Sequence, residues 1–235
     1  MTPRLPDATD IAGVLTDPSL ALNYARWLPA DQDAAILDLG CGDGRVLRWL
    51  AARGHRNLHG IDRDRAALDS MGNWPGLQLE CADVSAARLR DLKGRYRLIV
   101  LRQMVYYIDR RDILEFMLAL RDALDDDGVL IVEFFNGALL SSRTTELKDP
   151  FIRTAYTEHS MRRLFDAASL ATLHVGPELR PAPSTLRSHV YALLRRAWTS
   201  TLRAIFILER GLDGELPRIW TKSLLAVARR PAGLR

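Results

Sequence analysis

The stretch Ile36–Leu47, ILDLGCGDGRVL, has a short apolar run, then glycines at positions 40, 42 and 44, then a segment of helical periodicity. This order predicts a buried strand, a tight turn and the start of a helix. Glycine permits a positive φ and lets the backbone approach a ligand where a Cβ would collide. The first turn of the helix also leaves backbone N–H groups unpaired. The stretch therefore predicts a strand–loop–helix unit that can bind a ligand.

A dinucleotide-binding fold uses the same unit, but its fingerprint is GxGxxG. Here the third glycine comes one residue early and Arg45 follows it. The dinucleotide pattern is broken, so a nicotinamide-dependent oxidoreductase is a minor alternative.

Apolar runs and amphipathic segments alternate on both sides of this stretch, as they do in βαβ units that form a mostly parallel sheet. Further strands are expected at Asn57–Ile61, Leu77–Cys81, Tyr96–Leu101, Val129–Phe135, Leu170–Val175 and Ile219–Arg229. Helices are expected from Asp17-Pro18 to about Leu28, and at Arg45–Arg53, Ala66–Met71, Ala86–Leu92, Ile113–Leu124, Thr157–Ala168 and Thr185–Glu209.

The composition is that of a globular protein: among 235 residues, 48% are hydrophobic and 26% are charged. No apolar run approaches the roughly 18–20 residues that span a bilayer, and the N-terminal residues lack the apolar stretch of a secretory signal. The cysteines are Cys41 and Cys81, in unlike segments. We therefore expect reduced thiols and a cytoplasmic protein.

The charge is unevenly distributed. All but three of the 33 basic residues are arginine, a bias typical of a GC-rich, bacterial genome. From Arg180 onward there are ten arginines and one lysine against three acids, a net charge of +8. Because the whole chain carries +4, the first 179 residues carry −4. This asymmetry indicates an anionic partner or surface near the C-terminal quarter.

The segments after the glycine stretch complete a family pattern. Asp62 ends the second expected strand, 18 residues after Gly44. The segment CADV (Cys81–Val84) ends the third expected strand, and the fourth and fifth strands lie in LIVLRQMVYYI (Leu98–Ile108) and DDDGVLIVEFFN (Asp125–Asn136). With an acidic residue two positions before GxGxG, the chain resembles the class I S-adenosylmethionine-dependent methyltransferases over roughly Ala34–Ala168.

The resemblance implies an α/β, Rossmann-like fold. Its mostly parallel seven-stranded sheet has helices on both faces and a terminal antiparallel hairpin, and here a helical insertion precedes the last strand. We expect a single domain, 1–235. It comprises a helical lead-in (1–33), a cofactor-binding core (34–176), the insertion (177–217) and the last strand with its tail (218–235).

The resemblance also implies S-adenosylmethionine as cofactor, S-adenosylhomocysteine as product, and no metal. Asp38 would contact the amino group of the cofactor, Asp62 both ribose hydroxyls, and Asp83 with the Val84 N–H the adenine. The full expected set is Asp38, Gly40, Cys41, Gly42, Gly44, Asp62, Arg63, Asp83, Val84 and Arg102. These features also have a purely structural interpretation. A GxGxG stretch by itself is typical of a tight turn, and Asp62 or Asp83 by itself could be a helix N-cap.

The catalytic base is harder to identify. Many small-molecule members of the family have a histidine after the fourth strand, in a pattern like hHvpD, where this chain has VYYID and Tyr107 takes its place. A tyrosine is a poor base near neutral pH because its reference pKa is about 10. The candidates are Tyr107 with neighbouring Tyr106, Glu133 near the end of the fifth strand, and His159 after a helix N-cap.

Motifs that the sequence lacks reduce the number of expected classes of methyl acceptor. There is no [DNS]PP[YFW] after the fourth strand and no paired-glutamate loop, which disfavours methylation of nucleic-acid bases and of protein arginines. The tail arginines are not interleaved with aromatics as in a strand-stacking platform. We expect O- or N-methylation of a small-molecule, sugar or lipid-linked acceptor in biosynthesis, by in-line displacement. The alternative is a non-catalytic cofactor-binding regulator.

The segment Thr185–Glu209 is amphipathic, with Arg187, Arg195, Arg196 and Arg203 on its polar side. In this family, insertions between the last two strands often build an acceptor lid. Its apolar stripe is expected to pack on the domain or in a homodimer. A second reading is peripheral contact with an anionic membrane through 185–209, at the inner face of the membrane.

Overall fold

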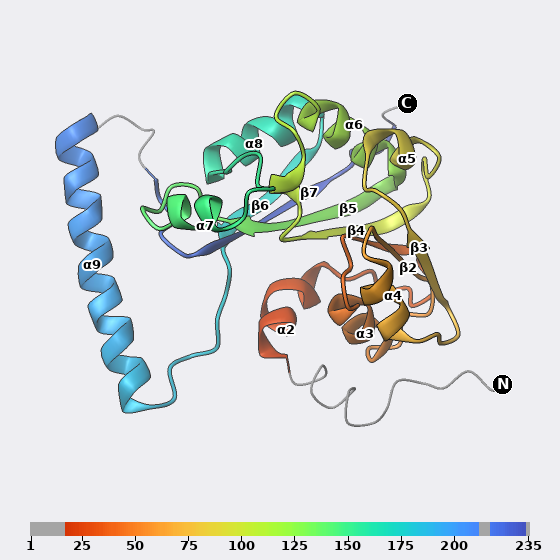
Figure 1. Ribbon diagram of the computed structural model, residues 1–235, viewed down its shortest axis with the longest axis horizontal. Helices are drawn as coiled ribbons and strands as arrows, with labels where there is room; N and C mark the ends of the chain where they lie inside the picture. The colour runs from red at the N-terminus through yellow and green to blue at the C-terminus, as the bar shows by residue number, and fades with distance from the viewer. Residues whose placement is uncertain (1–16, 212–216, 234–235) are drawn as a thin grey trace.

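The computed structural model describes residues 17–211 and 217–233. Seven strands form one sheet in the order β3-β2-β1-β4-β5-β7-β6, in which β7 is antiparallel to both neighbours and the other pairs are parallel (Figure 1). The strands are β1 (Ile36–Leu39), β2 (Leu58–Asp62), β3 (Leu77–Cys81), β4 (Tyr96–Arg102), β5 (Leu124–Phe135), β6 (Ala171–Pro177) and β7 (Ser223–Arg229). The expected mixed sheet with a terminal antiparallel hairpin is confirmed.

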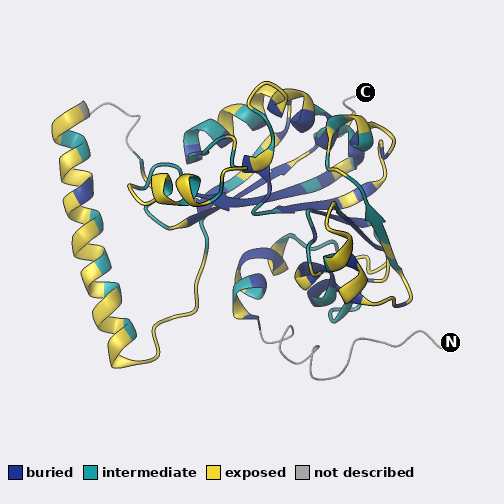
Figure 2. Cartoon of the chain, viewed as in Figure 1, coloured by how far each residue is buried: buried dark blue, intermediate teal, exposed yellow. Residues whose placement is uncertain are grey.

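Helices cover both faces of the sheet. One face packs against α2 (Pro18–Tyr24), α3 (Arg45–Ala51) and α4 (Arg65–Met71), and the other against α5 (Ala86–Arg90), α6 (Ile113–Ala123) and α8 (Glu158–Ala167). The remaining helical segments are the 3₁₀ turns η1 (Ala25–Trp27) and η2 (Val105–Tyr107), the short α7 (Ser142–Lys148) and α9 (Leu186–Arg210). Figure 2 shows that the sheet is buried, whereas α9 is exposed along most of its length.

Local sequence explains these elements. Strands β1 and β4 are nearly continuous apolar runs because both of their faces are covered by helices. Asp17 caps α2 by accepting hydrogen bonds from Ser19 N and Leu20 N, and Pro18 occupies the first turn. Thr157 and Ser160 form a capping box at the start of α8.

The topology brings the functional segments to one edge. The carboxyl ends of the parallel strands β1 to β5 lie together at that edge. Phe135 of β5 pairs with Ser223, and Pro177 of β6 pairs with Leu224, so β6 ends and β7 begins there as well. The insertion that contains α9 therefore leaves and re-enters the sheet at the edge where ligands of open α/β sheets bind.

Candidate active site

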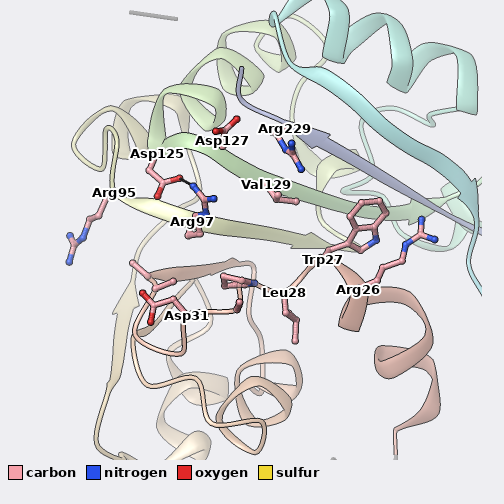
Figure 3. A pocket seen from close by; sticks show the side chains of 14 residues that line it. Arg26, Trp27, Leu28, Asp31, Arg95, Arg97, Asp125, Asp127, Val129 and Arg229 are labelled. Carbon is pink, nitrogen blue, oxygen red and sulfur yellow. Dashed lines mark hydrogen bonds and ion pairs between the residues drawn. The ribbon is translucent and has the colours of Figure 1, made fainter. Parts of the chain in front are cut away.

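The opposite edge carries a large pocket that is not the candidate site. It has a volume of about 740 Å³ and lies at the amino-terminal ends of β1, β4 and β5 (Figure 3). Arg97 and Asp125, an ion pair at 3.5 Å, contribute to its charged lining, together with Arg26 and Trp27. None of the residues expected to bind a cofactor lines it. The site is therefore built at the carboxyl edge.

The glycine loop connects β1 to α3 through three positive-φ residues. Gly40 N donates to Ile61 O at 2.8 Å, which holds the loop against the end of β2. Gly42 has a φ of +53°, and a Cβ there would meet no protein atom within 4 Å. Gly44 begins α3, and a Cβ there would lie 1.8 Å from Met71 Sδ. A side chain at Gly44 would have to displace Met71 and adopt a φ of +77°, whereas Gly42 leaves open space that a ligand can fill.

Asp62 holds this loop with both carboxylate oxygens. Oδ2 accepts from Gly42 N at 2.8 Å, and Oδ1 accepts from Asp64 N at 2.9 Å. A carboxylate has about four lone-pair sites, so each oxygen can accept a second hydrogen bond. The side chain is only half-buried and can take two hydroxyl donors from a ligand.

Asp38 is the buried acid of the site. It is almost fully buried within β1, and its Oδ1 has no hydrogen-bond partner among the described residues. Burial raises the pKa of Asp38 to about 7, against the opposing effect of the Arg102 charge. A buried acceptor without a donor costs about 1–3 kcal/mol, and a cationic donor such as an amino group would satisfy it. Together with the space at Gly42 and the free lone pairs of Asp62, Asp38 makes this edge fit a nucleoside that carries an amino acid.

The other residues expected to bind the cofactor surround these two acids. Asp83 is exposed and Val84 half-buried in the loop after β3, where Ala82 N donates to Asp62 O at 3.0 Å. Arg63 is exposed beside Asp62, and its carbonyl accepts from Cys81 Sγ at 3.6 Å.

Cys41 and Arg102 lie deeper in the same edge. The Cys41 thiol is buried, and burial raises its pKa, so it remains a neutral lining group. Arg102, at the end of β4, is half-buried, and its Nε lies 3.4 Å from Glu133 Oε1. The edge thus holds a positive charge between two buried acids, Asp38 and Glu133.

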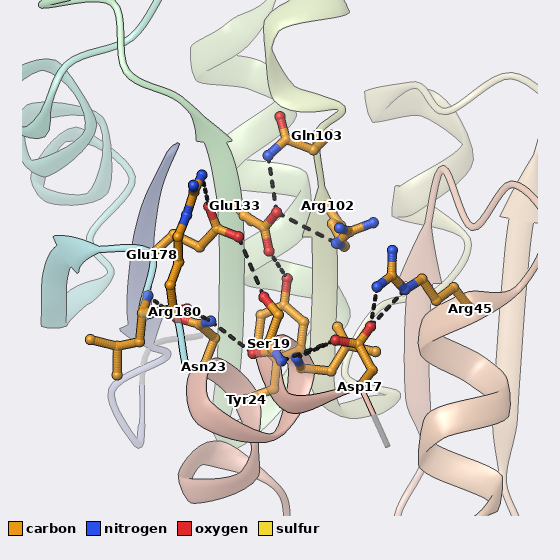
Figure 4. A network of polar contacts seen from close by, with 12 residues as sticks. Asp17, Ser19, Asn23, Tyr24, Arg45, Arg102, Gln103, Glu133, Glu178 and Arg180 are labelled. Carbon is orange, nitrogen blue, oxygen red and sulfur yellow. Dashed lines mark hydrogen bonds and ion pairs between the residues drawn. The ribbon is translucent and has the colours of Figure 1, made fainter. Parts of the chain in front are cut away.

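Glu133 is the centre of a buried polar network (Figure 4). It is 4% exposed; its Oε2 accepts from Tyr24 Oη, and its Oε1 accepts from Gln103 Nε2 at 3.0 Å. Burial, and next the Glu133 charge, raise the pKa of Tyr24 well above its ordinary value. Gln103 has a φ of +53°, which is rare outside glycine, and its N–H donates to Glu133 O at 2.8 Å. Each oxygen of Glu133 thus accepts a side-chain hydrogen bond within this buried network.

Helix α2 carries Tyr24 into this network and fastens it at both ends. Asp17 accepts a hydrogen bond from Arg45 Nε at 2.7 Å, which links α2 to the helix after the glycine loop. Asn23 exchanges hydrogen bonds with the backbone of Leu179, at 2.9 and 2.8 Å. The helix thus bridges the glycine loop and the start of the insertion (Figure 4).

The tyrosines after β4 form an aromatic group. The Tyr106 ring lies 4.7 Å from that of Tyr107 and 4.8 Å from that of Phe135, between ring centroids. Tyr107 Oη donates to Asp149 Oδ2 at 2.7 Å, and burial followed by this carboxylate raises the pKa of Tyr107. The surroundings of Tyr107 therefore favour its protonated form.

His159 lies on α8. Its Nε2 is 3.5 Å from Glu158 Oε1. It lines a hollow of about 590 Å³ together with Asn136, which directly follows β5, and Phe206 of α9. Of the three candidate bases, Glu133 lies in the buried network, Tyr107 pairs with Asp149, and His159 faces this hollow.

A groove runs along the inner side of α9. Two adjoining hollows of about 830 and 410 Å³ share the lining residues Arg180, Tyr191, Arg195 and Thr199. The smaller one also reaches Leu139 and Leu140, in the loop after β5, and Lys222, which precedes β7. The groove therefore continues from the carboxyl edge and combines cationic with aromatic side chains.

Some functional positions were not predicted from the sequence. Tyr24 and Gln103 complete the Glu133 network, and Asn23 ties α2 to the insertion. The spacing of Leu20 and Tyr24 gave a signal, since residues four apart share a helix face. The polar partner of Tyr24 is 109 residues away in the chain and left no local signal.

Comparison with known proteins agrees with this geometry. A family model described as a methyltransferase domain matches residues 16–175. Over 99 residues the chain is 31% identical to the ribosomal RNA small subunit methyltransferase A of Rhodopseudomonas palustris (strain HaA2). That match covers 40% of this chain and 34% of the relative, so the chain spans about a third of the length of that protein.

Solved structures resemble the whole fold. A SAM-dependent methyltransferase from Archaeoglobus fulgidus superposes with a TM-score of 0.64 at 15% identity, covering 92% of this chain and 93% of that one. Phosphoethanolamine N-methyltransferase 2 of Haemonchus contortus, in complex with S-adenosyl-L-methionine, gives 0.62 at 14% identity, covering 92% of this chain and 53% of that one. At such low identity these likenesses show the fold.

Proposed function

This chain belongs to the class I S-adenosylmethionine-dependent methyltransferase family, and we propose that it transfers the methyl group to a small-molecule, sugar or lipid-linked acceptor. Its cofactor is S-adenosylmethionine. The observation that carries the proposal is the carboxyl edge of the sheet, where the unpartnered Asp38 Oδ1, the open space at Gly42 and the lone pairs of Asp62 lie around one loop.

The cofactor, when bound, supplies a sulfonium-activated methyl group, so the protein needs to bind and orient rather than to create an electrophile. Asp62 would accept the ribose hydroxyls while still holding the Gly42 N–H. Asp38 would accept the amino group, and the half-buried Arg102 would face the carboxylate of the same moiety. Asp83 and the Val84 N–H would contact the adenine.

We assign Glu133 to positioning. It is buried, Tyr24 and Gln103 donate to its two oxygens, and Arg102 lies 3.4 Å away, so these contacts hold the carboxylate within the network. It would fix Gln103 and the end of β4 at the methyl-transfer edge. Tyr107 and His159 remain candidate bases for an oxygen acceptor, which needs its proton removed.

The acceptor would bind along the groove inside α9. Arg180, Arg195 and Lys222 supply positive charge there, and Tyr191 and Trp198 supply aromatic surface. This combination suits an amphipathic acceptor with an anionic part. A nitrogen acceptor that is already neutral would need no base.

A second candidate function is a non-catalytic regulator that binds the cofactor. The observation in its favour is that Glu133 is buried within its network and that the Tyr107 hydroxyl donates a hydrogen bond to Asp149.

Two measurements separate these functions. Thermal shift with S-adenosylhomocysteine, NAD and NADP should show stabilisation by the first alone, and stabilisation by a nicotinamide instead would contradict the family function. Incubation with methyl-tritiated S-adenosylmethionine and a fractionated cell extract should then place the label in the small-molecule or lipid fraction. Tight cofactor binding with no labelled fraction would favour the regulator, and label in RNA or protein would overturn the acceptor class.

A further inference from the structure

Among the described residues, the contacts that join helix α9 to the domain lie on one side of the helix. Leu202 is buried, the Phe206 ring lies 5.4 Å from that of Trp220, and Arg195 Nη2 donates to Trp220 O at 3.4 Å. These residues recur at helical spacing and define the inner side of α9. Figure 1 shows the rest of the helix standing clear of the sheet and its covering helices. The inner side of α9 therefore packs against the rest of the chain.

The outer side is apolar and exposed. In chain order its large side chains are Leu186, Val190, Leu193, Leu194, Ile205 and Leu208, which we call the outer stripe. Leu186 and Leu208, near the two ends, are 83% and 86% exposed, so the stripe runs the length of the helix (Figure 2). A helix of 25 residues is about 37 Å long. The exposed side chains of the outer stripe form two groups, at 186–194 and 205–208, and exposed apolar patches of this kind mark an interaction site.

The charges beside the stripe are of one sign. Arg196 and Arg203 are exposed along one side of it and Arg187 lies on the other, whereas Arg195 belongs to the inner side. No aspartate or glutamate occurs from 186 to 208. Trp198, which lines the smaller hollow of the groove and is also exposed at the border of the stripe, has the amphipathic ring that is enriched at lipid–water interfaces. The partner that complements this surface is apolar inside and negatively charged at its boundary.

A second copy of the chain does not have that chemistry. Two outer stripes placed face to face would bring the arginines of one helix beside those of the other with no acid between them. Repulsion between like charges opposes such a pair. An anionic lipid surface offers acyl chains to the leucines and phosphates to the arginines at the same time.

We propose that the outer stripe of α9 lies flat on a membrane that contains anionic lipid, with its leucines in the boundary between headgroups and acyl chains. Among the described residues no helix is long and apolar enough to cross a bilayer. Since the insertion leaves and re-enters the sheet at the carboxyl edge, this docking brings the groove inside α9 to the lipid surface. The docking itself does not depend on the proposed function. The further step, in which the groove receives an acceptor from the lipid, rests on that function.

The test uses the full chain with vesicles of phosphatidylcholine alone or with about one third phosphatidylglycerol, an anionic lipid, at low and high salt. Wild-type protein should co-sediment with the anionic vesicles at low salt and much less at high salt or with the neutral vesicles. The double variant Leu193→Glu/Leu208→Glu should lose at least about 100-fold in vesicle affinity. Arg196→Gln/Arg203→Gln, which keeps the stripe, should lose about tenfold or more.

The matched control is Leu114→Glu/Leu147→Glu, which makes the same change at exposed leucines of α6 and α7. It should bind vesicles within about threefold of wild type. All variants should retain wild-type affinity for S-adenosylhomocysteine, which verifies folding and keeps this test separate from that of methyl transfer. Wild-type protein that ignores anionic vesicles, stripe variants that bind them as tightly as wild type, or a lipid-free dimer that the stripe variants abolish would each overturn the proposal.

Discussion

Replacement of Asp62 by alanine should weaken cofactor binding by about 2–4 kcal/mol. The structure shows where this free energy comes from. Each carboxylate oxygen accepts one backbone N–H, from Gly42 at 2.8 Å and from Asp64 at 2.9 Å, and retains a lone pair for a ribose hydroxyl. Hydrogen bonds to a charged group contribute about 1.5–3 kcal/mol each. Loss of two such bonds, partly replaced by water, corresponds to roughly 30- to 1,000-fold in Kd.

The Asp62→Asn variant is not conservative here. Because both oxygens accept backbone N–H groups, the amide must turn its own N–H₂ toward one of these donors. We therefore expect Asp62→Asn to bind almost as weakly as Asp62→Ala and to destabilise the fold by about 1 kcal/mol.

Isothermal titration calorimetry with S-adenosylhomocysteine measures the affinities, and urea denaturation measures the stability. The control is Asp43→Ala in the same loop, where the exposed carboxylate makes only a long contact, 3.4 Å, to Arg45 N. It should bind within about twofold of wild type. Equal affinities for wild type and Asp62→Ala, or an equal loss in Asp43→Ala, would refute the reasoning.

Three further predictions concern the same edge. Gly42→Val should abolish S-adenosylhomocysteine binding and leave a native circular dichroism spectrum. The control is Gly72→Val, which is equally open and has a φ of +72°, so it measures the effect of backbone strain alone. Normal binding by the Gly42 variant would show that the cofactor site lies elsewhere. Burial raises the pKa of Asp38 to about 7, so the folded state retains a proton that the unfolded chain has lost, and the unfolding free energy should fall as pH rises from about 4 to about 7. Asp38→Asn should lack this contribution, and parallel pH curves for the two proteins by urea denaturation would contradict it. A double-mutant cycle of Tyr24→Phe and Glu133→Gln should give a coupling of about 1–3 kcal/mol in unfolding free energy, and additive effects would show that the two side chains do not interact.

Much of the fold could be predicted because its signals are local. The strand Leu77–Cys81 and the N-caps Asp17 and Thr157 occur as predicted, and the helix expected from Thr185 has Thr185 as its N-cap. Apolar runs fix the buried strands, and capping chemistry fixes where these helices begin.

The differences also have physical causes. Strand β5 begins at Leu124 rather than Val129, because the backbone pairs with β4 across an irregularity in the acidic turn, where Asp127 has a φ of +62°. Strand β7 begins at Ser223, later than the predicted Ile219. Helix α7 was not predicted, since SRTTELK has no apolar periodicity and none of its residues is buried.

The candidate site also combines features that the sequence predicts with contacts that it does not predict. The glycine loop and Asp62 follow from strand ends, which a sequence can locate. The Tyr24–Glu133 and Asn23–Leu179 contacts join residues 109 and 156 positions apart, and only the packed structure brings them together. The amphipathicity of α9 was predicted, but the apolar stripe does not pack on the domain as one of the two expectations had it, because the side that meets the domain carries Arg195, Leu202 and Phe206.

The strand order has a consequence for biosynthesis. In the described sheet β6 pairs only with β7, and β7 also covers the edge of β5. In a nascent chain that has emerged as far as β6, β5 therefore has an open edge and β6 has no partner strand, and unpaired strand edges are templates for aggregation. The sheet closes only after residues 223–229 leave the ribosome, so α9 is made during the period of greatest exposure. Because the entropy of loop closure grows slowly with length, changes in the length of this insertion should alter the rate of folding more than the final stability.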